Sequence, residues 1–374
     1  MNTIVLGSNH NNTLGLIWSL GKAGHDVTLI LYRHGNNYVS KSKYIKKTYL
    51  INDGKDDIIK LIIEIAKEYV DKPVVFATSD NDAAILNDHF YELSPFCFFE
   101  GCKYDGSINR FRDKDTGNQL AKECGFDLPK NIVVFSKDQI RTTELPYPII
   151  VKANNSIHGG KTAMQKCDTV QEYMSFVDSM PDSYFPLQVQ EFIDKDYEIM
   201  LLGCSLEGGE QVICPIANRK FRQYPRPMGL GSYSESIAVR HQTDLVLLSQ
   251  KTADYLKRIQ YTGLFSAEFL YSAGKYYFLE INLRNDGTSW LSTCSGYNLP
   301  DIVCHGFTDN GYSIKDNFVK KYYMNIVADF HYVKDGTISL LKWLRLFNKK
   351  TCYSHLNFKD LRPFFYYVGS LLKH

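Results

Sequence analysis

The 374-residue sequence contains no run of about eighteen apolar residues, so no segment resembles a membrane-spanning helix. Its nine cysteines include no CxxC pair, which argues against a disulfide scaffold or a thiolate zinc site and favours a reducing compartment, the cytoplasm. A formal charge of only +2 gives no sign of a nucleic-acid partner. The N-terminus lacks a positive segment and a long apolar stretch, and we expect a first strand there rather than a signal peptide.

What is present is an alternation of strand and helix patterns over the first hundred residues. Short apolar runs at 3–8, 25–32 and 73–79 alternate with helical spacings at 14–24, 56–70 and 80–93. This alternation predicts an N-terminal Rossmann-like domain, with a parallel sheet, over residues 1–105. The turn at 7–15 lacks the G-x-G-x-x-G spacing of a dinucleotide site. His10 in this turn either lines a cleft or caps the following helix.

Residues 150–198 carry groups that suit a nucleotide. Lys152 closes a β-branched strand, where a lysine is costly to desolvate unless an anion meets it. Backbone N–H groups at Gly159 and Gly160 can complete an anion cradle. Alternatively, this segment is a β-hairpin whose lysine reaches water. Glu191 ends one apolar strand and Glu198 opens the next, a junction that suits a base and a ribose diol.

Polar residues interrupt the apolar strands near residue 280. Glu280, Asn282 and Arg284 alternate along one strand and therefore point to the same face. Glu268 lies in the preceding apolar strand. Two carboxylates and an amide oxygen are ligands that Mg²⁺ prefers when phosphate oxygens complete its shell. The cluster therefore predicts a site for metal-bound phosphate.

A basic stretch, "NRKFRQYPRPMGLGSYSES" at 218–236, combines cations with a glycine-containing loop. Either Arg219 alone or Arg222 together with Arg240 can bind the carboxylates of a small acidic substrate, since arginine favours two-pronged contacts. Lys220 is a further candidate for substrate binding, and Arg222 is predicted to act in catalysis. The alternative is a charged strand face that is simply solvated.

These motifs occur in the order and spacing of the ATP-grasp superfamily. The order runs from Lys114 and the Lys152 glycine loop through "QEFIDKDYEI" at 190–199 to Glu268 and "LEINLR" at 279–284. The basic stretch looks most like the carboxylate–amine ligases of the D-aspartate ligase type. The resemblance covers about residues 1–310 and implies a mixed α/β and α+β protein. It places a two-subdomain ATP-grasp fold at 106–312, with a glycine-loop subdomain at about 115–190.

The resemblance also implies a role for each residue of the phosphate half of the site. It makes Lys114 and Lys152 the phosphate-binding lysines, together with the backbone of Gly159 and Gly160. It places Glu191 at the hinge that binds adenine.

The remaining assignments concern the sugar, the metal and the transferred phosphate. Glu198 would bind the ribose of ATP. Glu268, Glu280 and Asn282 would ligate Mg²⁺, which Mn²⁺ can replace. Arg284 would lie near the γ-phosphate or the acceptor carboxylate.

The implied activity is an ATP-dependent ligase that forms an amide through an acylphosphate. We expect an acidic or D-amino acid as substrate, in cell-wall or surface-polymer synthesis. The expected partners are small-molecule carboxylates and amines, and the formation of a homodimer is left open. Two alternatives stand beside it. One is a non-catalytic ATP-binding sensor or partner-binding module, which is expected to lack a metal ligand. The other is a carboxylate or carbamate kinase on the same fold.

The basic C-terminal extension, 313–374, carries eleven Lys or Arg against four Asp. Within it, "SLLKWLRLFNKK" at 339–350 spaces Leu340, Trp343, Leu344 and Phe347 on one helical face. Such a helix either contacts an anionic membrane surface peripherally or packs its apolar face on the ATP-binding domain.

Overall fold

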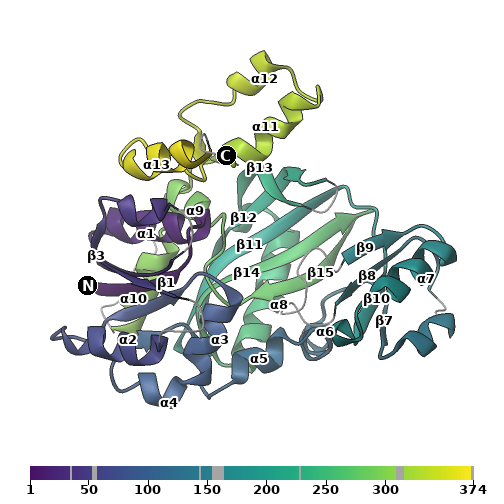
Figure 1. Cartoon of the computed structure of the whole chain (residues 1–374), viewed down its shortest axis with the longest axis horizontal. Helices are drawn as coiled ribbons and strands as arrows, with labels where there is room; N and C mark the ends of the chain where they lie inside the picture. Colours follow the sequence, from purple (N-terminus) through teal and green to yellow (C-terminus); the bar gives the residue numbers. More distant parts are fainter. Residues whose placement is uncertain are drawn as a thin grey trace. The chain divides into compact units, whose positions relative to one another are not determined.

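The computed structural model describes residues 1–33, 36–52, 57–142, 145–153, 164–226, 229–308 and 316–371 (Figure 1). The chain divides into two compact units. Unit 1 consists of Met1–Ile108, Ile199–Ala267 and Ile281–His374. Unit 2 consists of Asn109–Glu198 and Glu268–Glu280, and it contains the predicted glycine-loop subdomain.

The N-terminal part of unit 1 is the predicted parallel sheet, with strand order β3-β2-β1-β4-β5. The strands are β1 (Asn2–Gly7), β2 (Asp26–Tyr32), β3 (Ile45–Ile51), β4 (Val74–Ala77) and β5 (Phe98–Phe99). Its helices are α1 (Asn11–Ala23), α2 (Ile58–Lys67), α3 (Asp80–Asp88) and α4 (Phe90–Leu93). The helix expected over 80–93 is split, because the backbone at His89 leaves the helical region (φ −116°, ψ 34°).

A larger sheet follows, with order β15-β14-β11-β12-β13-β16-β17 and β6 paired to β14. Its strands are β6 (Gly101–Cys102), β11 (Tyr197–Leu206), β12 (Gln211–Tyr224), β13 (Leu230–Ala238), β14 (Tyr261–Ser272), β15 (Lys275–Asn282), β16 (Tyr322–Met324) and β17 (Thr351–Tyr353). The associated helices are α8 (Thr243–Arg258), α9 (Trp290–Cys294) and α10 (Leu299–Phe307).

The core of unit 1 fixes which face of this sheet each residue occupies. Met200 and Leu202, at every second position of β11, join Ile216 of β12 and Leu264 of β14 in one buried cluster. Side chains alternate along a strand, so the residues that continue this parity share the core-facing side.

Unit 2 is built on a four-stranded antiparallel sheet of order β7-β10-β8-β9. The strands are β7 (Asn131–Val134), β8 (Ile149–Ala153), β9 (Met164–Cys167) and β10 (Leu187–Glu191), and the helices are α6 (Lys114–Glu123) and α7 (Val170–Ser179). Tyr173 and Phe176 of α7 pack on Val151 and Val189 of the sheet, and Figure 1 shows α7 alongside this sheet. Helix α5 (Ser107–Arg112) runs from one unit into the other.

The C-terminal extension adds α11 (Ile326–Lys334), α12 (Leu340–Leu344) and α13 (Arg362–Leu371) to unit 1. Helix α12 is shorter than the pattern at 339–350 predicts. Trp343 and Phe347 pack with Tyr233 of β13, as the packing alternative requires. Leu340 and Leu344 remain about half exposed. None of the helices in the described residues combines the length and apolar character of a membrane-spanning segment.

A buried ion pair ties this extension to β12. Asp329 of α11 is fully buried and accepts bonds from Arg222 Nε and Nη2 at 2.8 and 2.7 Å. Ser232 Oγ and Trp343 Nε1 donate to the same carboxylate at 2.9 Å each. Four donors satisfy a carboxylate that would otherwise be costly to desolvate.

We predict that Asp329→Ala lowers the free energy of unfolding by about 3–5 kcal/mol, because it leaves the Arg222 guanidinium without its buried partner. Asp335→Ala removes the partner of Arg226 in an exposed pair and should barely move the unfolding midpoint. Urea denaturation compares the two variants, and equal small shifts would contradict the prediction.

Candidate active site

Two lysines of unit 2 come together at the start of α6 and the end of β8. Asp113 caps α6, so Lys114 is its first residue and donates from Nζ to the Ala153 carbonyl at 2.8 Å. Lys152 donates from Nζ to Gln190 Oε1 of the neighbouring strand at 3.3 Å. The partners of both ammonium groups in these bonds are therefore neutral oxygens.

The electrostatics of this pair favour an incoming anion. Burial lowers the pKa of Lys152 to about 8, the charge of Lys114 lowers it as well, and Glu280 opposes both effects. Burial also lowers the pKa of Lys114, again against the pull of Glu280. Two cations sharing one carboxylate leave an excess of positive charge that phosphate can neutralise. Strands β8 and β9 pair antiparallel, as the hairpin alternative also requires, so the phosphate-binding role of Lys152 stays a prediction.

The other residues that are predicted to bind the nucleotide lie in the same unit. The Glu191 carboxylate accepts the Lys130 N–H at 3.0 Å, and Glu191 N donates to Lys130 O at 2.9 Å. Glu198 forms an ion pair with Lys195. Their adenine and ribose roles stay predictions. Gly159 and Gly160 lie outside the described residues.

The predicted metal ligands lie on neighbouring strands, Glu268 on β14 and both Glu280 and Asn282 on β15. Asn282 Oδ1 accepts from Arg284 Nη2 at 3.1 Å, and its Nδ2 donates to Ser266 Oγ at 3.3 Å. Hard oxygens of this kind fit Mg²⁺. No group of three His, Cys, Asp or Glu that could hold a metal ion gathers among the described residues, and the metal role of Glu268, Glu280 and Asn282 stays a prediction.

Arg284 is held by a residue that sequence reasoning missed. Asp80, at the start of α3, accepts from Arg284 Nε at 2.8 Å, and the Asn285 carbonyl accepts from Nη1 at 3.0 Å. These contacts fix the plane of the guanidinium. The sequence did hold a signal for Asp80, because it follows parallel strand β4, and ligands of such sheets bind at the carboxyl ends of the strands.

An asparagine network joins the first residues of α1 to the loop after β15. Asn12 Nδ2 donates to the carbonyls of Thr78 and Asn285 at 2.7 and 2.9 Å. Asn11 Nδ2 donates to the Gly287 carbonyl at 2.9 Å. His10 accepts the Asn12 N–H and caps α1, so the capping alternative is confirmed.

Asn218 is a second residue that the sequence did not single out. It is fully buried and donates from Nδ2 to Thr288 Oγ1 at 3.0 Å, while its Oδ1 has no hydrogen-bond partner among the described residues. A buried amide oxygen without a donor is uncommon, and this oxygen can accept a hydrogen bond from a small polar ligand. Asn218 and Lys220 continue the parity of Ile216 and therefore share the face that also carries Ser266.

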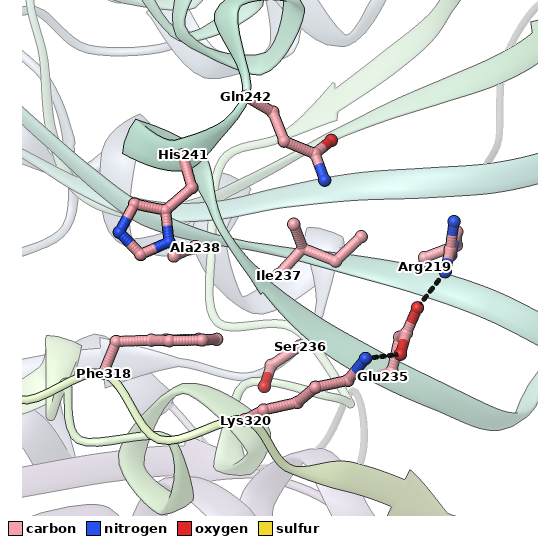
Figure 2. Close-up of a pocket in the computed structure, with 9 residues that line it drawn as sticks. All are labelled: Arg219, Glu235, Ser236, Ile237, Ala238, His241, Gln242, Phe318 and Lys320. Carbon is pink, nitrogen blue, oxygen red and sulfur yellow. Dashed lines mark hydrogen bonds and ion pairs between the residues drawn. The ribbon is translucent and has the colours of Figure 1, made fainter.

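Arg219 has the opposite parity, so its side chain lies on the other face of β12, where it lines a pocket. Figure 2 shows this pocket, of about 220 Å³, with Arg219 and Lys320 on the two oxygens of Glu235. The Glu235 side chain is only 3% exposed. The further lining residues are Ser236, Ile237, Ala238, His241, Gln242 and Phe318.

Carboxylates of the chain itself also hold the other predicted arginines. Arg222 binds Asp329, and Arg240 pairs with Asp316 and donates to Tyr297 Oη at 3.3 Å. A substrate carboxylate would have to compete with these partners. The substrate and catalytic roles of these arginines stay predictions.

Comparisons with known proteins place these features in context. The chain is 25% identical to the D-aspartate ligase of Enterococcus faecium over 285 residues, which are 70% of this chain and 66% of the ligase, just under two thirds of its length. No family model matches.

Solved structures give stronger likeness in fold. The N5-carboxyaminoimidazole synthetase of Staphylococcus aureus, complexed with ADP, has a TM-score of 0.66 at 16% identity, covering 89% of this chain and 85% of that one. The biotin carboxylase domain dimer of Hydrogenobacter thermophilus 2-oxoglutarate carboxylase, with MgADP, has a TM-score of 0.63 at 15% identity, covering 85% and 73%.

We predict that phosphate binding to Lys152 is linked to proton uptake. With a pKa of about 8, the free lysine loses its proton as the pH rises through 8, whereas a bound phosphate keeps it protonated. Affinity for ATP should therefore be constant below pH 8 and fall above it. Titration calorimetry at pH 8, in buffers of different ionisation enthalpy, measures the uptake.

Lys152→Arg is the matched control, because arginine remains charged throughout this range. It should bind ATP without the proton uptake. If Lys152→Met takes up as many protons as the unaltered chain, another group is responsible.

Proposed function

We propose that this chain, which belongs to the ATP-grasp superfamily, is an ADP-forming ligase that joins a carboxylate to an amine with ATP and Mg²⁺. The relatives confirm the predicted family and fold. The observation that carries the proposal is the pair Lys114 and Lys152, two partly desolvated cations that share the single carboxylate of Glu280.

The proposed reaction needs charge neutralisation more than it needs a nucleophilic side chain. A carboxylate oxygen attacks the γ-phosphorus, the bond to the β-phosphate oxygen breaks, and ADP leaves an acylphosphate. The amine then attacks the acyl carbon and displaces phosphate. Lys114, Lys152 and Arg284 offset the repulsion between anionic reactants. When bound by Glu268, Glu280 and Asn282, Mg²⁺ supplies further neutralisation of the phosphate oxygens.

We infer an acidic or D-amino acid as the substrate, in the synthesis of a cell wall or surface polymer. The D-aspartate ligase relative supports this choice. On the chain itself, the buried amide of Asn218 and the ammonium group of Lys220 lie on one face of β12. An amide oxygen that lacks a donor suits a substrate ammonium group, and a lysine suits its carboxylate. The cytoplasmic location and the homodimer stay predictions.

One screen separates this function from its alternatives. ADP release is measured with D- and L-amino acids, each with and without amines, and the products are identified by mass spectrometry. A ligase gives ADP and a condensed product that has lost water. A kinase gives ADP with the carboxylate alone, and hydroxylamine traps its acylphosphate. A binding module gives no ADP with any pair.

We predict that Glu280→Gln lowers turnover at least 100-fold with the fold intact, because it removes one ligand charge at almost constant volume. Glu64→Gln on α2 is the matched control and should retain full activity. Circular dichroism checks the fold of both variants. Full activity of Glu280→Gln at ordinary Mg²⁺ concentrations would remove Glu280 from the metal site.

Arg284→Lys should lower kcat by about 100-fold with little change in KM for ATP. Lysine keeps the positive charge but lacks the two parallel N–H donors of the guanidinium group. Asp80→Asn should lower kcat by about tenfold, because Asn retains an acceptor for Arg284 Nε but no charge. Asp88→Asn, on the same helix, is the control. Steady-state kinetics with each substrate varied decide the matter, and an effect of Asp80→Asn confined to KM would contradict this positioning role.

A further inference from the structure

Exposed apolar side chains concentrate in the last part of the chain. Of the twenty large apolar side chains that the described residues leave exposed, eight lie among residues 340–371. On α12, Leu340, Leu341 and Leu344 are 50%, 71% and 49% exposed. Beyond it, Phe358 and Phe365 are 75% and 64% exposed. Single exposed apolar residues are normal, but a concentration of this kind marks an interaction surface.

All exposed charges in this part of the chain are positive. Between residues 336 and 371, every residue of which is described, the exposed cations are Lys342, Arg345, Lys349, Lys350, Lys359 and Arg362. The single acidic residue of this range, Asp360, is 3% exposed and accepts bonds from Trp18 and Ser42. We name the exposed side chains of residues 340–350 and 358–371 the tail surface.

Packing beneath the tail surface holds these groups in place. Trp343 is anchored through Asp329, and the Phe347 ring stacks on Tyr353 with centroids 5.3 Å apart. Tyr353 in turn contacts Phe358 at 6.5 Å. Figure 1 shows α11, α12 and α13 gathered at one end of the view. The outward leucines are therefore attached to a packed base.

Helix α13 is attached to unit 1 separately. Its Tyr367 stacks on His355 with centroids 4.0 Å apart and contacts Tyr38 at 5.1 Å. The neighbouring Phe365 and Tyr366 remain exposed. Phe365 and Tyr366 are therefore exposed on a helix that packs against unit 1 through Tyr367.

We propose that the tail surface docks the protein on an anionic lipid bilayer. Leucine and phenylalanine side chains enter the boundary between headgroups and acyl chains, and the lysines and arginines lie among the lipid phosphates. Neither signal alone gives firm attachment, whereas the two together do. The contact is peripheral, since α12 has only five residues. This inference does not depend on the ligase activity, because the tail surface shares no residue with the candidate active site.

The charge pattern disfavours two other occupants. In a two-fold dimer the same patch meets itself, so these cations would face cations. A nucleic acid would meet the lysines and arginines and could stack bases on Phe358 and Phe365, but it would leave the three leucines of α12 exposed to water. An anionic bilayer matches both the charge and the aliphatic side chains.

The test is cosedimentation of the full chain with vesicles of phosphatidylcholine, either pure or mixed with phosphatidylglycerol. We expect binding to the mixed vesicles only, weakening as salt is added. Lys349→Glu/Lys350→Glu should weaken binding more than tenfold, because each cation near such a surface contributes roughly a factor of five. Leu340→Ser/Leu344→Ser should weaken it at low and high salt alike.

Val70→Ser/Lys60→Glu, at exposed positions of unit 1 outside the tail surface, is the matched control and should bind as the unaltered chain does. Thermal melting verifies that each variant is folded. Equal binding to both vesicle types, or no effect of either tail variant, would overturn the proposal. So would a change of oligomeric state in the tail variants, or displacement from vesicles by RNA but not by salt of equal ionic strength.

Discussion

A desolvated cation needs an anion, and this requirement organises both units of the protein. In unit 1, Arg222 and Arg284 receive carboxylates from the chain itself, Asp329 and Asp80. In unit 2, Lys114 and Lys152 donate to neutral oxygens and share the influence of one carboxylate. The arginines are thus satisfied by folding, whereas the lysines retain an excess of charge for a ligand. This difference distinguishes Arg222, whose ion pair holds the fold, from the two lysines, for which phosphate binding is the proposed role.

The residues of β12 also fall into two groups, according to the face of the strand on which their side chains lie. Asn218 and Lys220 share the face of Ser266, and Arg219 between them points to Glu235 on the other face. Adjacent residues of the basic stretch therefore face different environments. The asparagine network around Asn12 then fixes the loop after β15, which contains Arg284. Specificity for a small polar substrate fits this arrangement, because amides bind by direction and distance more than by net charge.

The C-terminal extension combines two roles in one short segment. Asp329 and Trp343 bury polar and aromatic groups against β12 and β13. The exposed residues of α12 are either leucine or positively charged, namely Leu340, Leu341, Lys342 and Leu344. A stable attachment on one side is what allows apolar groups to stay exposed on the other without collapsing onto the core. The tail surface is thereby presented on a packed base.

The sequence by itself determined the features that depend on near neighbours. Strand and helix periods predicted the parallel sheet, and Asp113 and His10 lie where they cap α6 and α1. Alternation placed Glu280 and Asn282 on one face of β15. Tertiary structure alone decided the partners of the charged groups, because Arg222 and Asp329 are 107 residues apart and no local pattern links them. It also decided which leucines of the tail stay exposed, since helical spacing defines an apolar face but not what that face meets.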